Sequence, residues 1–278
     1  MLSWLSSYLS AVFEMLPLYD SQGKYEEAEP LFLQALELRK RLLGENHPHV
    51  ATSLNNLAHL YHLRGKYEEA EHLYLQALEL KKRLLGENHL DVATSLNNLA
   101  FLYNSQGKYE EAEALYLQSL ELLKRLLGEN HPKVASSLNN LAFLYNSQGK
   151  YEEAEPLFLQ ALELFKQLLG ENHSAVATSL NNLARLYKSQ GRYEEAEPLH
   201  LQALKLRERL LGENHPHVAI SLNDLAELYR SQGKYEEAEP LYLQALAIAE
   251  QALGENHPTT VKIRENLQTL RQQQHPSS

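Results

Sequence analysis

The sequence contains no cysteine, which excludes disulfide bonds, thiolate nucleophiles and metal sites with cysteine ligands. It also lacks any apolar run of about 18 residues, the length from which a membrane-spanning helix is considered. Basic residues number 26 against 36 acidic ones, for a net charge of −10. A general nucleic-acid binder needs a basic face that displaces counterions. We therefore expect neither a nucleic-acid nor a membrane partner, and a cytoplasmic location fits the absence of cysteine.

The first residues are uncharged and apolar but do not resemble a secretory signal, which would have a basic start and a small-residue cleavage site. Their large apolar side chains instead recur at helical spacing, at Leu2, Leu5, Leu9, Phe13 and Leu16. Pro17 interrupts the pattern, since proline removes a helical hydrogen bond. We predict a divergent N-terminal helix over residues 1–22, the degenerate first half of a repeat.

An internal repeat of 42 residues dominates the rest of the chain. A tyrosine recurs at this period, at Tyr25, Tyr67, Tyr109, Tyr151, Tyr193 and Tyr235. All twelve glycines fall into two registers of the same period, one beginning at Gly23 and the other at Gly44. Two helix breakers per period divide each repeat into two segments of helical length, so the sequence predicts tandem helix pairs.

The second repeat shows how each pair is specified. We predict a first helix from Pro48 to Arg64, capped by Asn46 or His47, because proline is tolerated in a first helical turn. The second helix begins near Tyr67 and ends before a glycine with positive φ, Gly86. Apolar residues at three- and four-residue steps are expected to be buried, namely Leu54, Leu57, Ala58 and Tyr61 on the first helix and Tyr67, Ala70, Tyr74, Ala77 and Leu78 on the second.

Charged residues gather at both ends of the second helix. Three glutamates occupy its first turn and three basic residues its last, namely Glu68, Glu69, Glu71, Lys81, Lys82 and Arg83. This order opposes the helix dipole at each end. The charge runs therefore have a structural explanation, and we assign them no binding role.

Small and aromatic residues at Ala58, Tyr61, Ala70, Tyr74 and Ala77 resemble the tetratricopeptide signature. The 42-residue period and the segment LLGENHLDVATSLNNLA, which ends at Ala100, are similar to the kinesin light chain branch of that family. The resemblance implies an all-α fold, a right-handed α-solenoid of tandem antiparallel helix pairs (a tetratricopeptide repeat superhelix). We place the array at residues 23–257, followed by a solvating cap helix and tail over 258–278, because a terminal helix must be polar on its outer face.

The sequence offers no pattern for catalysis. It has no phosphate loop, dinucleotide fingerprint or nucleophile elbow. The Gly-Glu-Asn-His loop repeats six times, but equivalent histidines in neighbouring repeats lie about 10 Å or more apart, too far to share a metal ion. Helix capping is the favoured role for His47, His89, His131, His173, His215 and His257. We predict no enzyme, no metal and no cofactor.

Residues that vary on the constant scaffold are the candidates for binding. A second stripe on each first helix points away from the packing face. In proteins of this resemblance the stripe lines the concave groove and receives extended peptides. The candidate groove residues are Asn55, His59, Asn97, Phe101, Asn104, Asn139, Phe143, Asn146, Asn181, Arg185, Lys188, Asn223 and Arg230.

The recurring asparagines could serve either of two purposes, since an amide donates and accepts. They either pair with the backbone of a peptide or tie neighbouring helices together, and the adjacent asparagines, such as Asn98 and Asn140, are expected to do the latter. Phe101 and Phe143 suggest apolar anchors in the ligand, and the basic residues from Arg185 onward suggest acidic ones. Kinesin light chains favour tryptophan-plus-acidic peptides, which agrees.

We therefore predict a non-enzymatic scaffold that binds a protein or peptide ligand in the concave groove. The sequence is also compatible with two other functions. The array could be a sensor or regulatory region of a larger signalling ATPase or protease, contacting other domains of that assembly. It could also be a structural array that assembles end to end.

Overall fold

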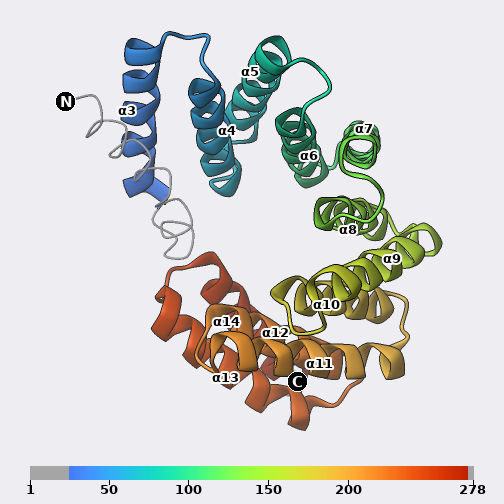
Figure 1. Ribbon diagram of the computed structural model, residues 1–278. Coiled ribbons are helices and arrows are strands. Elements are labelled where there is room, and N and C mark those ends of the chain that lie inside the picture. Colours follow the sequence, from blue (N-terminus) through green and yellow to red (C-terminus); the bar gives the residue numbers. More distant parts are fainter. Residues whose placement is uncertain (1–24, 275–278) are drawn as a thin grey trace. The chain divides into compact units, whose positions relative to one another are not determined.

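The computed structural model describes residues 25–274, and within them it contains only helices (Figure 1). The helices are α3 (Tyr25–Leu43), α4 (Pro48–Leu63), α5 (Tyr67–Leu85), α6 (Leu90–Ser105), α7 (Tyr109–Leu127), α8 (Pro132–Ser147), α9 (Tyr151–Leu169), α10 (Ser174–Ser189), α11 (Tyr193–Leu211), α12 (Pro216–Ser231), α13 (Tyr235–Leu253) and α14 (Pro258–Gln274). None of these twelve is long and apolar enough to cross a bilayer. The helix predicted over residues 1–22 lies outside the described residues.

The chain divides into two compact units, of which the first ends at Leu144 and the second begins at Tyr145, both within α8. In the first unit α4 packs on α5 and α6 on α7; in the second α10 packs on α11 and α12 on α13. Second helices also pack on the first helix of the following pair, as α5 does on α6 and α11 on α12. The predicted all-α fold of tandem helix pairs is confirmed.

Local sequence signals define where the helices begin and end. The Nδ1 atom of His47 accepts a hydrogen bond from the backbone N–H of His49 at 3.2 Å, so His47 is the N-cap of α4. At the end of α5, Gly86 has φ 80° and ψ 164°, a region that is essentially restricted to glycine. Pro48 and Tyr67 begin their helices as predicted.

The buried face agrees with the apolar pattern except at its tyrosines. Leu54, Leu57 and Ala58 are buried, as are Ala70, Tyr74, Ala77 and Leu78. Tyr61 is only half-buried. The prediction that Tyr67 is buried is wrong: it is 37% exposed, because it is the first residue of α5 and its ring lies at the surface, 5.8 Å from that of His62.

The assignment of Lys81 to the helix dipole is also wrong. Its side chain is buried, and its Nζ donates to Ser95 Oγ on α6 at 2.9 Å. Only Lys82 and Arg83 remain in the last turn of α5 as predicted. A long lysine side chain can bury its methylene groups while its ammonium reaches a polar partner, here a hydroxyl of the next helix.

The third glutamate of the first-turn run joins consecutive pairs. Glu71 on α5 accepts hydrogen bonds from Tyr103 Oη at 3.1 Å and from Lys108 Nζ at 2.9 Å. In the second unit Glu155 accepts in the same way from Tyr187 and Arg192. The glutamate run thus supplies a tie between repeats as well as a favourable charge at the helix start.

Candidate functional site

The first helices of the pairs carry the asparagines predicted to line a groove, and in the first unit these amides bond to one another. Asn98 Nδ2 donates to Asn55 Oδ1 at 3.0 Å, and Asn140 Nδ2 donates to Asn97 Oδ1 at the same distance. The side-chain carbonyls of Asn55 and Asn97 therefore tie consecutive first helices together. Asn139, the next in this row, is half-buried.

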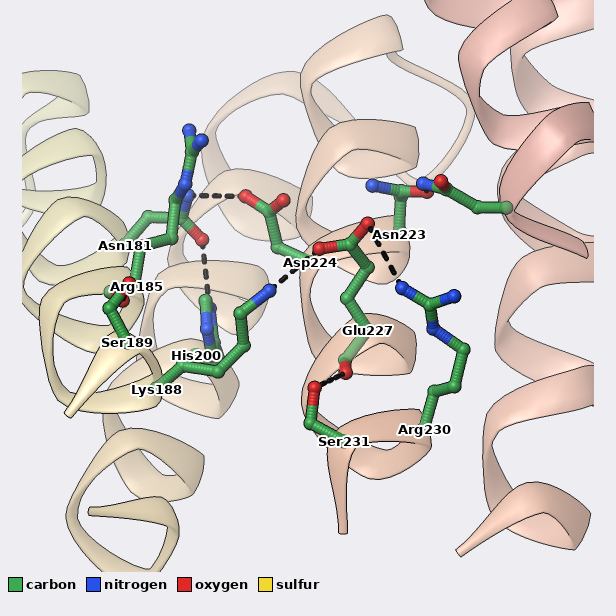
Figure 2. A network of polar contacts seen from close by, with 11 residues as sticks. Asn181, Arg185, Lys188, Ser189, His200, Asn223, Asp224, Glu227, Arg230 and Ser231 are labelled. Carbon is green, nitrogen blue, oxygen red and sulfur yellow. Dashed lines mark hydrogen bonds and ion pairs between the residues drawn. The ribbon is translucent and has the colours of Figure 1, made fainter. Parts of the chain in front are cut away.

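In the second unit the row changes chemistry (Figure 2). Asn266 Nδ2 donates to Asn223 Oδ1 at 2.9 Å, which repeats the pattern of the first unit. Asn181 instead donates from Nδ2 to Asp224 Oδ2 at 2.7 Å, and its Oδ1 lies 3.0 Å from His200 Nδ1. Asn181 is only 3% exposed and both ends of its amide are bonded, so it is not accessible to a peptide as predicted.

His200 is the centre of this network and was not singled out from the sequence. Asn181 donates to Asp224, so the Asn181 oxygen must accept from His200, which places the imidazole proton on Nδ1. The residue is fully buried, and its Nε2 has no partner among the described residues. Burial lowers the pKa of His200 to about 4. The sequence does contain a signal for this site, because a histidine stands where other repeats have an aromatic residue, at Tyr74, Tyr116 or Phe158.

Aromatic side chains gather on the first helices of the first unit. Phe101 on α6 is 42% exposed, and its ring centroid lies 5.0 Å from that of His62 on α4. His62 is itself buried, with Nε2 within 2.9 Å of Ser105 Oγ, and burial lowers its pKa to about 4. His59 is half-buried, with its ring 6.5 Å from that of His62. Phe101 therefore presents an apolar ring to solvent above a buried imidazole.

The remaining predicted residues of this region are less accessible. Phe143 is half-buried and Asn104 is buried. The Oδ1 atom of Asn104 has no partner within residues 25–274, and the same holds for Asn146 Oδ1 in the second unit. Neither amide oxygen is exposed, so a ligand would reach them only after a side-chain movement.

The predicted basic residues of the second unit lie around the carboxylate of Glu227, to which the sequence analysis assigned no role (Figure 2). Glu227 Oε2 lies 2.6 Å from Lys188 Nζ, and Glu227 Oε1 lies 4.0 Å from Arg230 Nη2. Burial would raise the pKa of Glu227, but Lys188, Arg230 and, to a smaller extent, Arg185 outweigh it and hold the pKa below its usual value. Lys188 and Arg230 are thus partly neutralised, and Arg185 is the exposed cation of the three.

The repeated histidines cap helices. Each Nδ1 accepts from the backbone N–H two residues on, at 3.1 to 3.2 Å, for His47, His89, His131, His173, His215 and His257. The capping role predicted for this loop is confirmed. Across the described range, no group of three or more histidine, aspartate or glutamate residues is placed to hold a metal ion.

Comparison with known protein families identifies the repeat. The profile described as "Tetratricopeptide repeat" matches in six overlapping segments, at residues 18–83, 50–125, 91–167, 133–209, 176–251 and 222–276. A search of curated proteins gives no significant match.

Solved structures similar to this chain include two related to kinesin light chains. BtubC (BKLC) from P. vanneervenii is 29% identical with a TM-score of 0.66, over 84% of this chain and 94% of that one. A putative kinesin light chain of Podospora anserina with nearly identical repeats is 29% identical with a TM-score of 0.58, over 74% and 97%. NprR in complex with its cognate peptide NprX shares the fold at 17% identity, with a TM-score of 0.70 over 99% and 74%.

Proposed function

Because the chain belongs to the tetratricopeptide repeat family, we propose that it is a non-enzymatic scaffold that binds an extended peptide or a partner protein in the concave groove formed by its first helices. The ligand has one or two apolar anchors and acidic residues. The structure of NprR, which shares the fold, contains a peptide. In this chain the first helices carry side chains that differ between repeats, such as His59, Phe101 and Arg185 at one register, so they are where a ligand would be distinguished.

Phe101 is the observation that carries the proposal. Phe101 is 42% exposed, whereas most apolar residues of α6 are buried, and an exposed aromatic ring of this kind is a candidate contact for a partner. The ring lies beside buried His62, and its exposed part offers an apolar surface for one large side chain of a ligand. Aromatic residues of this kind contribute strongly to binding when a partner excludes water from them.

Acidic residues of the ligand would contact Arg185. Its side chain is exposed, whereas Lys188 and Arg230 share Glu227. A ligand carboxylate gains most from a cation that is not already paired. The acidic preference should therefore depend on Arg185 more than on Lys188 or Arg230.

The test begins by selecting peptides from a random library against the intact chain and measuring their affinity by fluorescence polarisation. Phe101→Asp should weaken binding about tenfold or more, the effect of removing a buried anchor. Leu117→Asp is the matched control, because Leu117 is 45% exposed but lies on the second helix α7. Equal affinities for both variants and the unaltered chain would exclude the proposed face.

Asn97→Ala is a poorer test of the same proposal. Asn97 accepts a hydrogen bond from Asn140, so its loss would alter the packing of α6 on α8 as well as any peptide contact. A change in affinity would then have two explanations. Phe101 is preferable because it lies at the surface.

A further inference from the structure

A small cavity opens in the first unit among α6, α7 and α8, helices labelled in Figure 1. Its volume is about 150 Å³, and its lining includes Asn97 from α6, Ser119 and Leu123 from α7, and Ser137 and Asn140 from α8. An engineered cavity of similar size is known to bind benzene, so a side chain can enter a space of this volume. Asn97 and Asn140 are the bonded amides described above, which places the cavity on the proposed binding face.

Three other repeats fill the equivalent position with a buried cation of their own. Lys81 Nζ donates to Ser95 Oγ at 2.9 Å and lies 3.5 Å from the carbonyl oxygen of Asp91. Arg39 donates to Ser53 Oγ at 2.8 Å, and Arg207 to Ser221 Oγ at 2.7 Å. In each case the cation comes from a second helix and its acceptors from the next first helix.

The repeat with the cavity lacks this cation. Leu123 stands where Arg39, Lys81 and Arg207 stand in their repeats. Its side chain is shorter and carries no donor. Ser137 is equivalent to the serines that accept from these cations in the other repeats. It is 2% exposed, and its Oγ has no hydrogen-bond partner in the described part of the chain. A buried hydroxyl without a partner costs free energy that a suitable donor would recover.

We infer that a lysine or arginine side chain of the bound peptide enters this cavity and replaces the missing cation. Its nitrogen donates to Ser137 Oγ and to the carbonyl oxygen of Lys133, the two kinds of acceptor that the protein's own buried cations use. Its methylene groups lie against Leu123, whose side chain rotates to admit the nitrogen to the hydroxyl. This inference rests on the proposed function and adds a basic anchor to the same ligand.

Two charges act in opposite directions on a basic ligand side chain that approaches the cavity. The net charge of −10 favours the approach of a basic partner. Lys133 at the cavity opposes it, but its side chain is exposed and its charge is therefore screened. The corresponding residue beside Lys81 is Asp91, whose charge acts against the lowering of the Lys81 pKa by burial. Lys133→Asp should consequently tighten binding of the basic anchor about two- to fivefold.

The experiment selects peptides from a random library against the unaltered chain and against Leu123→Lys, which copies Lys81 and fills the cavity from within. The unaltered chain should select lysine or arginine at one position, and replacing that residue by alanine should weaken binding about tenfold. Leu123→Lys should bind both peptides equally and select no basic residue. The same substitution at the equivalent position of another repeat, Phe165→Lys, is the control and should keep the basic preference.

An unchanged basic preference in Leu123→Lys overturns the inference, as does a set of binders with no basic position. In the latter case the proposed function stands, whereas a library that yields no binder at all contradicts that function.

If no binder is obtained, the cavity is tested directly by titration with n-butylammonium, and binding is followed by the methyl resonances of Ala93 and Leu123. We expect a dissociation constant on the order of 10 mM and weaker binding of n-pentanol. No shift, or equal binding of the alcohol, overturns the inference.

A second variant, which makes the opposite change at another repeat, keeps the inference testable if Leu123→Lys does not fold. Lys81→Leu removes the cation that fills the equivalent position beside Ser95. It should create a second butylammonium site in a chain whose own cavity is untouched. Failure of this variant to gain a site, while its circular dichroism is unchanged, also contradicts the inference.

Discussion

Helices α7 and α11 occupy the same place in their repeats, one in each unit, and yet bury different chemistry. Both begin with Tyr-Glu-Glu-Ala-Glu and both run for 19 residues. At the fully buried aromatic position α7 has Tyr116 and α11 has His200. Seven residues further on, α7 has Leu123 and α11 has Arg207. The same backbone thus supports Tyr116 and Leu123 on α7 and two basic residues, His200 and Arg207, on α11.

The difference teaches that a buried polar residue on a second helix depends on an acceptor on the neighbouring first helix, whereas the acceptor by itself does not require the polar residue. Arg207 donates to Ser221 of α12, and His200 bonds to Asn181 of α10. Around α7 the corresponding serine, Ser137, has no partner in the region that the structure describes, and a cavity lies beside Leu123. The buried cation of α11 donates to a serine of α12, whereas α7 has no cation at this position and a cavity remains beside the serine of α8.

The largest expected effect comes from emptying the aromatic position of α7. Tyr116→Ala should lower the free energy of unfolding by about 3–5 kcal/mol, because it removes a fully buried ring and leaves a void. Urea denaturation followed by circular dichroism measures it. Tyr116→Phe is the control and should change stability by less than about 1 kcal/mol, since the Tyr116 hydroxyl has no partner among the described residues. A loss below about 1 kcal/mol for the alanine variant would contradict this packing.

A smaller effect distinguishes the polar position of α11 by its pH dependence. The pKa of His200 is lowered to about 4 in the folded chain, against about 6.5 when unfolded. Unfolding therefore takes up a proton between these values, and stability present above pH 6.5 is lost as the pH falls toward 4. At pH 5 the loss is about 2 kcal/mol relative to neutral pH.

Comparison with His200→Phe isolates this contribution from that of other histidines, such as His62. Burial is the main cause of the shift; Asp224 acts against it, while Lys188, Arg185 and Arg207 add to it. Urea titrations of both proteins at pH 7 and pH 5 give the difference. The unaltered chain should lose more stability than the variant, and equal losses would show that His200 does not titrate in this window.

The smallest effect is expected when α11 is given the residue of α7. Arg207→Leu recreates the pair formed by Leu123 and Ser137, and we expect it to lower the free energy of unfolding by only about 1 kcal/mol, because the hydroxyl of Ser221 loses its donor while the desolvation cost of the buried guanidinium is removed. Asp224 keeps its hydrogen bond from Asn181 in this variant. A loss above about 3 kcal/mol would mean that Arg207 is needed as a counter-charge for Asp224.

The helices could be predicted from the sequence because local residues define them. Pro48 and Tyr67 begin α4 and α5, Gly86 adopts a backbone angle that other residues rarely take, and His47 caps α4. Each of these signals acts within a few residues of chain. The 42-residue period then repeats them, so the pairs and their order follow.

The interior chemistry could not be predicted in the same way. The sequence predicts a helix-end charge at Lys81, whereas its burial depends on Ser95, which lies 14 residues away on another helix. Asn181 was expected in the groove, but His200 and Asp224 occupy both ends of its amide. Glu227 partly neutralises a surface that was expected to be basic. Such pairings depend on which residues two helices bring together, and Phe101 as a peptide contact stays a prediction.

The ties between repeats have a constant length in sequence, and this bears on how such a gene can change. Asn98 and Asn55 lie 43 residues apart, as do Asn266 and Asn223, and Tyr103 and Glu71 lie 32 apart, as do Tyr229 and Glu197. If recombination between similar copies removes or duplicates one whole period, a residue of each required type again stands at the required distance. Repeat number can therefore vary without loss of these bonds, whereas an insertion of any other length would break them.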